Sequence, residues 1–272
     1  LRAEDTGNWT PTVVTGQATY SADNRWRLTD VTNIANIPVG SLVQAAGVGR
    51  EIYVKSKNVG AQEITLSQPL SDAEGRQTYT FTRFKYLLDF SGFERLNVFE
   101  LDDVEFQCGE QASGVMLAPL GTVNVIRNCV FNRPGHRGVT SIGDGCQGLL
   151  VDHNQFISYE GGKLTQNRVS VAINTNANDV KLRNNRASQF RHFAVISGAH
   201  TVISGNHFFQ GDASSNGIRS AGIVMCLRAC NAQISGNYVD NCHIEWTNER
   251  EPEPDNTGGF GFAGLSVTNN VF

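Results

Sequence analysis

The sequence predicts an all-β protein in which residues 90–272 form a coil of stacked parallel strands and residues 1–89 form a small antiparallel β module. Three observations carry this prediction. The tetrapeptide Ile-Ser-Gly-Asn begins at Ile203 and again at Ile234, 31 residues later. Short strands rich in Val and Ile recur through the same region, with Asn and Gly between them. The first ninety residues lack this repeat and alternate short strands with Gly, Pro and Asn turns.

The repeat is anchored on an asparagine that has an apolar residue three positions before it and another two positions after it. Such units must stack, because one unit alone cannot bury its apolar side. We expect the anchor to adopt the left-handed backbone conformation at a bend. We also expect its side chain to hydrogen-bond from coil to coil, as amide ladders do. The anchors are Asn128, Asn154, Asn185, Asn206, Asn237 and Asn270, with Asp102 in the same place of a weaker copy.

A second apolar strand lies between successive anchors, in the segments that begin at Gly138, Val169, Phe193 and Ala221. With this pattern, the chain from about Phe90 onward resembles the right-handed parallel β-helix of the pectate-lyase-like superfamily. The resemblance implies a right-handed parallel β-helix, a solenoid, for residues 90–272. It indicates the fold and leaves the activity open.

Before the coils, the chain contains the segments EIYVKS from Glu51, EITLSQPL from Glu63 and TYTFTRF from Thr78, which predict an antiparallel β module. This part resembles the small β modules of phage tailspikes and related tail proteins. The acidic, Gly-Asp-rich segment that often opens a β-helix in that group is absent. The chain starts at Leu1 and stops after Phe272, so we expect a piece of a longer protein, truncated at the C-terminal end of the β-helix.

Composition excludes several classes of function. The net charge of −4 and the 18% of charged residues argue against a general nucleic-acid binder. The sequence contains no run of 18 apolar residues, so it predicts no membrane span. The cysteines form no CxxC pair, so we expect reduced thiols that pack in the core and no metal site. They are Cys108, Cys129, Cys146, Cys226, Cys230 and Cys242.

The second strands of four successive coils can be aligned on Ile142, Ile173, Ile196 and Val224. An arginine lies five residues before each of these four residues. These arginines are Arg137, Arg168, Arg191 and Arg219. Because stacked strands lie about 4.8 Å apart, four guanidinium groups in one column need anions between them. The column either lines a groove for an acidic polysaccharide, whose carboxylates or sulfates it binds, or pairs with carboxylates of neighbouring loops.

Loops of variable length precede these arginines, and insertions at one edge of a solenoid often build its binding face. Tyr159 and Trp246 in these loops are candidates to stack on sugar rings. Glycoside hydrolysis needs two carboxylates across the scissile bond, whereas β-elimination needs a base and a divalent cation that neutralises the uronate. The candidate acids are Asp144, Glu160, Asp212 and Glu245, and the candidate bases are His136, His192, Arg137 and Arg191.

These features favour a tailspike-like protein that binds a cell-surface or extracellular polysaccharide. We expect this polysaccharide to be acidic. If the protein is an enzyme, we expect it to degrade the same polysaccharide. The resemblance to tailspikes implies a homotrimer, other tail proteins as partners, and a place on a virion tail or outside the cell. Two alternatives stay open. One is a non-catalytic structural or adhesive β-helix, and the other is a secreted polysaccharide lyase. No cofactor is expected apart from the cation of a lyase.

Overall fold

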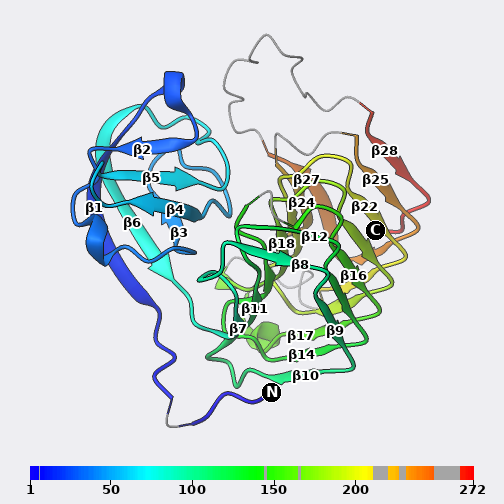
Figure 1. Cartoon of the computed structure of the whole chain (residues 1–272). Coiled ribbons are helices and arrows are strands. Elements are labelled where there is room, and N and C mark those ends of the chain that lie inside the picture. Colours follow the sequence, from blue (N-terminus) through cyan, green and yellow to red (C-terminus); the bar gives the residue numbers. More distant parts are fainter. Residues whose placement is uncertain (6, 144–145, 165–166, 211–219, 227–230, 248–263) are drawn as a thin grey trace.

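The computed structural model describes residues 1–272 except 6, 144–145, 165–166, 211–219, 227–230 and 248–263. Its described part consists of one antiparallel sheet and a stack of parallel coils, which lie side by side (Figure 1). Both predicted parts of the fold, the antiparallel β module and the parallel β-helix, are therefore confirmed. Among the described residues, no helix is long and apolar enough to cross a membrane.

The antiparallel sheet has the strand order β3-β6-β1-β2-β5-β4. Its longest strands, β1 and β6, pair along nine residues, and Leu28, Ile64 and Phe81 are fully buried in its core. The elements are β1 (Thr12–Tyr20), β2 (Arg27–Thr29), β3 (Leu42–Gln44), β4 (Val54–Asn58), β5 (Glu63–Leu66) and β6 (Gly75–Arg83), with 3₁₀ turns η1 (Ala22–Asn24) and η2 (Ile34–Asn36).

The coils build three long parallel sheets, each named here by its end strands. The β7–β27 sheet contains β7 (Tyr86–Asp89), β11 (Ser113–Met116), β15 (Arg137–Thr140), β18 (Val171–Thr175), β21 (His192–Ile196), β24 (Ser220–Met225) and β27 (Cys242–Trp246). The β9–β28 sheet contains β9 (Glu100–Asp102), β13 (Val125–Arg127), β16 (Leu150–Asp152), β19 (Lys181–Arg183), β22 (Val202–Ser204), β25 (Gln233–Ser235) and β28 (Ser266–Thr268).

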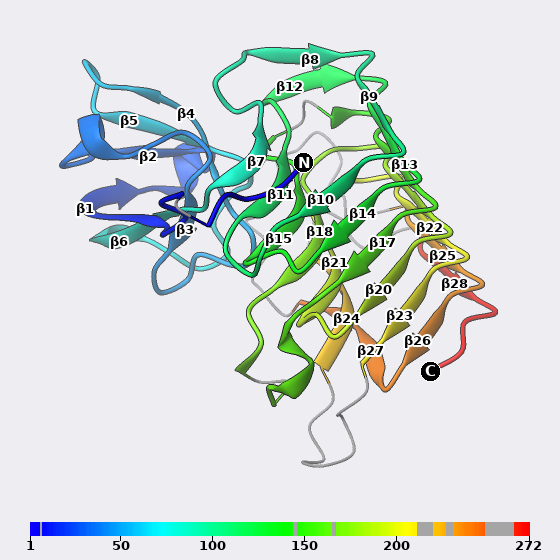
Figure 2. The ribbon, with the colours of Figure 1, turned by 90° about the horizontal axis from the view of Figure 1, so that it is seen from below.

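The third, the β10–β26 sheet, is seen from outside the coil in Figure 2, with the antiparallel module to one side of the stack. Its strands are β10 (Glu105–Gln107), β14 (Val130–Asn132), β17 (Gln155–Ile157), β20 (Arg186–Ser188), β23 (His207–Phe209) and β26 (Tyr238–Asp240). A short pair, β8 (Arg95–Asn97) with β12 (Leu120–Thr122), lies beside the first coils, and a 3₁₀ turn, η4 (Glu160–Gly162), follows β17.

The module lies between two segments that both belong to the coil stack. At the start of the chain, Arg2 forms a parallel bridge with Gln107 of β10, and the Ala3 amide donates to the Gln107 carbonyl at 2.9 Å. After the module, β7 already pairs with β11 in parallel. The parallel stack thus begins one strand before the expected boundary at residues 89 and 90.

Apolar side chains fill the inside of the coil. On the β10–β26 sheet, Phe106, Phe131 and Phe156 stack with ring centroids 4.6 and 4.7 Å apart and nearly parallel planes. Alternation along each strand sends these middle residues inward and the residues on either side outward. The described cysteines are buried, and Cys108, Cys129 and Cys146 among them are free thiols; the other two are Cys226 and Cys242.

The predicted amide ladder is confirmed at the corner between the β9–β28 and β10–β26 sheets. The side-chain oxygen Oδ1 of Asn206 accepts from the backbone and side-chain N–H groups of Asn185. The backbone and side-chain N–H groups of Asn206 donate to Oδ1 of Asn237, and its side chain also donates to the Leu182 carbonyl. The same bonds repeat in each coil of this asparagine ladder, which consists of Asn154, Asn185, Asn206, Asn237 and Asn270.

The left-handed conformation was predicted at the wrong residue. The residue before each ladder asparagine adopts it, as Gly205 (φ 66°) and Gly236 (φ 63°) do in the two Ile-Ser-Gly-Asn copies. Asn128 (φ 53°) takes this bend position too, because β13 pairs with β16 so that Cys129 lies opposite Asn154. Asn128 therefore lies outside the ladder, and the Cys129 amide donates to Asn154 instead.

Candidate functional site

The four arginines of the predicted column do not share one register. In the β7–β27 sheet, Ile173 lies opposite Val139 on one side and Ala194 on the other. The alignment on Ile142 and Ile196 was therefore wrong, since neither residue pairs with Ile173. Sequence spacing failed here because the loops between coils differ in length ahead of each strand. Arg219 lies outside the described residues, as do Asp144 and Asp212.

Arg137 forms a buried ion pair with the antiparallel module. Its Nε and Nη2 groups donate to the two carboxylate oxygens of Glu51 at 2.9 and 2.6 Å. Burial alone would lower the pKa of Arg137, but the Glu51 carboxylate raises it above its usual value. The Tyr53 hydroxyl also donates to Glu51, and the Phe84 ring lies 4.9 Å from the guanidinium carbon. Arg137 therefore holds the module against the coils and faces no open groove.

Arg168 and Arg191 are also engaged with the protein. Arg168 is fully buried and donates to the Gln210 side chain and to the carbonyls of Lys163 and Gly161. The Arg191 Nη1 group donates to the Arg168 carbonyl at 3.2 Å. For these arginines the structure describes contacts that order the loop after β17.

Glu160, at the start of the loop after β17, binds the residues at the end of the same loop. It is fully buried, and its carboxylate accepts hydrogen bonds from the Val169 and Ser170 amides and from the Ser170 hydroxyl. Lys163 lies 3.3 Å from the same carboxylate and 4.6 Å from the centre of the Tyr159 ring. The donors around Glu160 occupy its oxygens, and Tyr159 is covered on one side by the lysine.

The two predicted bases are neutral at pH 7. Burial lowers the pKa of His136 to about 4, with a further decrease from the Arg137 charge, and its ring stacks on Phe84. Burial likewise lowers the pKa of His192 to about 4. The Nδ1 atom of His192 lies 2.6 Å from the Ala221 carbonyl oxygen, which can only accept, so Nδ1 carries the proton.

The last two predicted residues lie on β27. The carboxylate of Glu245 accepts from both Nη atoms of Arg50, at 2.5 and 3.1 Å, which forms a second link between module and coils. Trp246 is half-buried and packs on the coil core. Its indole Nε1 group has no hydrogen-bond partner among the described residues. Among the described residues of the predicted set, the structure thus places each acid and base against protein partners.

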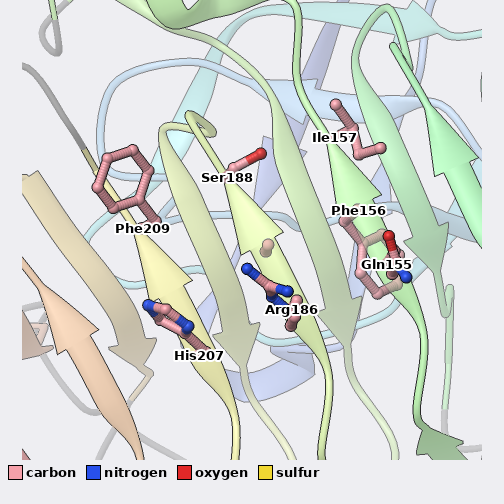
Figure 3. A pocket seen from close by; sticks show the side chains of 8 residues that line it. Gln155, Phe156, Ile157, Arg186, Ser188, His207 and Phe209 are labelled. Atoms are coloured by element: carbon pink, nitrogen blue, oxygen red, sulfur yellow. The ribbon is translucent and has the colours of Figure 1, made fainter.

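A different place in the fold is open and carries convergent polar and apolar groups. On the outside of the β10–β26 sheet, a pocket of about 400 Å³ crosses β17, β20 and β23 (Figure 3). A second pocket, of about 540 Å³, continues across β26 and shares His207 and Phe209 with the first. We call this surface the open face, and it consists of the outward residues Gln155, Ile157, Arg186, Ser188, His207, Phe209, Tyr238 and Asp240.

The open face has two rows, because the outward residues of a strand are two positions apart. The first row runs from coil to coil through Gln155, Arg186, His207 and Tyr238. The second row runs through Ile157, Ser188, Phe209 and Asp240. The first row consists of side chains that can form hydrogen bonds, whereas the second row alternates the apolar Ile157 and Phe209 with the polar Ser188 and Asp240.

Three large apolar side chains remain exposed in these rows. The exposed fraction is 39% for Ile157, 40% for Phe209 and 46% for Tyr238. The His207 ring meets the Tyr238 ring edge to face, with centroids 5.0 Å apart. Aromatic rings held against a sheet lose little entropy on binding, which suits them to contact a ligand.

Charged groups are few on the open face. Among the described residues that line the two pockets, Asp240 is the single carboxylate and Arg186 is the single guanidinium. One carboxylate does not supply the acid and base pair of glycoside hydrolysis. In the described part of the chain, no group of three His, Cys, Asp or Glu side chains is placed to hold a metal ion.

Sequence reasoning missed the open face, although the signal was present. Its residues lie one and three positions after successive ladder asparagines, as Arg186 and Ser188 do after Asn185. The buried ladder fixes the bend, so the next residue must point outward. Reading these two positions from each anchor would have predicted the mixed aromatic and polar rows.

No protein-family profile matches the chain, and no curated protein matches it. Among solved structures, it is similar to the catalytic domain of a GH87 alpha-1,3-glucanase in complex with tetrasaccharides, at 12% identity and a TM-score of 0.27. It is also similar to the Gp54 tailspike of Acinetobacter baumannii bacteriophage AP22 in complex with A. baumannii capsular saccharide, at 12% identity and a TM-score of 0.23.

The matches cover 96% of this chain but only 66% of the glucanase chain and 57% of the tailspike chain. The chain thus spans less than two thirds of either structure. The assignment of the fold rests on the sheets described above.

Proposed function

We propose that this protein binds a polysaccharide along the open face, with the saccharide chain crossing several coils of the β10–β26 sheet. The observation that supports this most directly is the pair of joined pockets, in which exposed aromatic and aliphatic groups alternate with amide, hydroxyl, imidazole and guanidinium groups. Binding sites combine apolar lining with a few placed polar groups that fix orientation. A sugar ring matches this pattern, because it offers C–H groups on its faces and hydroxyls around its edge.

The proposal is for binding rather than cleavage, since the lining of the open face holds a single carboxylate. We further propose the setting that the sequence resemblance implies: a tailspike-like homotrimer on a virion tail or outside the cell, together with other tail proteins. That part of the proposal depends on the resemblance of the module and the coils, and the open face itself could act in any extracellular setting.

The test is a binding panel of immobilised glycans: neutral glucans, polygalacturonate, alginate and sulfated dextran. Phe209→Ala and Tyr238→Ala remove exposed rings without touching the core, so we expect each to weaken binding about tenfold. Phe93→Ala is the matched control, because Phe93 is an aromatic residue that is 61% exposed away from the open face.

Binding that is unchanged in both open-face variants would overturn the proposal. The same panel, assayed for new reducing ends and for unsaturated products, tests cleavage. Turnover by the wild-type protein would contradict the assignment to binding alone.

A further inference from the structure

Arg186 on β20 is a cation that has no counter-ion among the described residues. Its side chain is exposed on the open face, and within the described part of the chain it makes no hydrogen bond, ion pair or aromatic contact. A guanidinium group keeps its charge at any physiological pH and offers five donors in a planar fork. The open face therefore presents a fixed positive charge with its full hydrogen-bonding capacity unused.

Several other arginines of the coils are paired with carboxylates. Arg127 lies 2.6 and 3.0 Å from oxygens of Glu100 and Asp102. Arg183, three residues before Arg186, lies 3.3 Å from Asp152 of the preceding coil. Arg137 and Arg133 are paired with Glu51 and Glu110. The same stacked geometry that pairs those arginines leaves Arg186 unpaired, because its own row contains no acidic residue near it.

The neighbours of Arg186 are suited to hold an anion beside it. Gln155 lies opposite Arg186 on β17 and His207 lies opposite it on β23, each about 4.8 Å away along the row. Figure 3 places the Arg186 side chain between these two residues. Ser188 lies two positions along the same strand and adds a hydroxyl. The acidic residue Asp240 is two strands away in the other row, at roughly 10 Å or more.

Apolar surface lies within reach of Arg186 in the neighbouring row. Ile157 and Phe209 occupy the second row, which runs roughly 6–7 Å from the row of Arg186. A sugar whose ring lies on Phe209 or Ile157 can extend a carboxylate from its edge toward Arg186. A bidentate pair between guanidinium and carboxylate has this planar geometry, and a sulfate ester offers comparable oxygens.

We infer that the open face selects an anionic saccharide, with Arg186 binding the carboxylate or sulfate of a sugar whose ring rests on the second row. This inference rests on the proposed function and names its substrate class. It assigns Arg186 as the residue that determines specificity, supported by Gln155, Ser188 and His207.

The experiment compares three soluble test glycans by calorimetry at constant ionic strength: an oligogalacturonate, the same oligosaccharide with its carboxyls methyl-esterified, and a sulfated dextran oligomer. Arg186→Gln removes one exposed charge from the open face. Lys181→Gln removes one exposed charge from β19 on another sheet and is the matched control. We expect Arg186→Gln to weaken binding of an anionic glycan at least tenfold and to leave the esterified glycan unchanged.

The arms of the experiment separate the outcomes. If Arg186→Gln weakens binding of the sulfated glycan alone, the result supports an anion site whose ligand is a sulfate ester. If it weakens binding of the oligogalacturonate alone, the ligand is a carboxylate. An equal loss in Lys181→Gln, or an equal loss for the esterified glycan, overturns the inference. If the esterified glycan binds as tightly as both anionic ones and still responds to Phe209→Ala, the inference fails while the proposed function stands. If no glycan responds to Phe209→Ala, the proposed function fails with it.

Discussion

Asn206 is the residue on which two neighbouring coils depend most directly. It is 3% exposed, and its side chain accepts two hydrogen bonds from Asn185 while donating to Leu182 and Asn237. A buried amide is stable only when its donors and acceptors are paired. The ladder therefore fixes the coil register, and through it the outward direction of the residues on the open face.

Replacing Asn206 by Ala should destabilise the protein by about 2–4 kcal/mol. The change leaves the Asn185 backbone N–H buried without its acceptor, which costs about 1–3 kcal/mol, and it also removes the side-chain bonds to the Leu182 carbonyl and to Asn237. The free energy of unfolding in urea measures the effect. Ser204→Ala, a half-buried outward position two residues earlier, is the control and should stay within about 0.5 kcal/mol. A loss in Asn206→Ala no larger than the control's would refute the role of the ladder.

Stability should fall on acidification through His192 of the β7–β27 sheet. His192 has a pKa lowered from 6.5 to about 4 by burial, so the folded protein keeps it neutral. Between these pH values the unfolded chain binds one more proton at this site, and the free energy of unfolding declines as pH falls. The decline is at most about 1.4 kcal/mol per pH unit for one site.

Unfolding in urea at several pH values from 7 to 4.5 measures this slope. His192→Gln removes the titrating group, so the free energy of unfolding should change less steeply with pH by the amount that His192 contributes. Ser204→Ala, which removes no titratable group, is the control and should leave the slope unchanged. Equal slopes for the wild-type protein and His192→Gln would show that His192 is not held neutral.

Between the elements, the segment from Arg50 to Tyr53 joins the antiparallel module to the β7–β27 sheet. Glu51 has a left-handed backbone (φ 52°), a conformation that is uncommon for a residue with a side chain. This bend brings its carboxylate to Arg137, where the pair is buried beside Phe84. Such a pair is sensitive to the loss of one partner, because the other charge then stays buried alone.

Glu51→Gln should therefore cost about 3–5 kcal/mol in the free energy of unfolding. Arg50→Gln breaks the partly exposed pair with Glu245 and should cost less than about 1 kcal/mol. Combining Glu51→Gln with Arg137→Met should recover part of the loss, since no uncompensated charge remains. Additive losses in the double variant, measured in the same urea titration, would refute coupling between the two residues.

At this scale the sequence predicts strands better than it predicts their partners. The strands β4, β5 and β6 and the ladder from Asn154 onward follow from alternation and from the spacing of the asparagines. The register of the β7–β27 sheet does not, because loops of different length precede each of its strands. That is why four arginines at equal distances from apolar residues do not form a column, and why Glu51 was not foreseen as the partner of Arg137.

For the whole molecule, the coil stack gives each sheet a different environment. The outside of β15 is covered by the antiparallel module, through contacts such as Tyr53 and Phe84 with Ile142. The outside of the β9–β28 sheet carries ion pairs between successive coils, among them Arg127 with Asp102 and Arg183 with Asp152. The β10–β26 sheet has neither kind of partner across its described pockets, and it is the surface left for a long ligand.

The most direct test of this account is hydroxyl-radical footprinting of the protein with and without a saturating glycan from the panel. The account predicts protection of Ile157, Phe209 and Tyr238, which are exposed side chains on the open face. Phe93 and Val13, exposed elsewhere, should react equally in both samples. Protection confined to Tyr159 and Trp246, with the open face unchanged, would contradict it and return the site to the loops of the β7–β27 sheet.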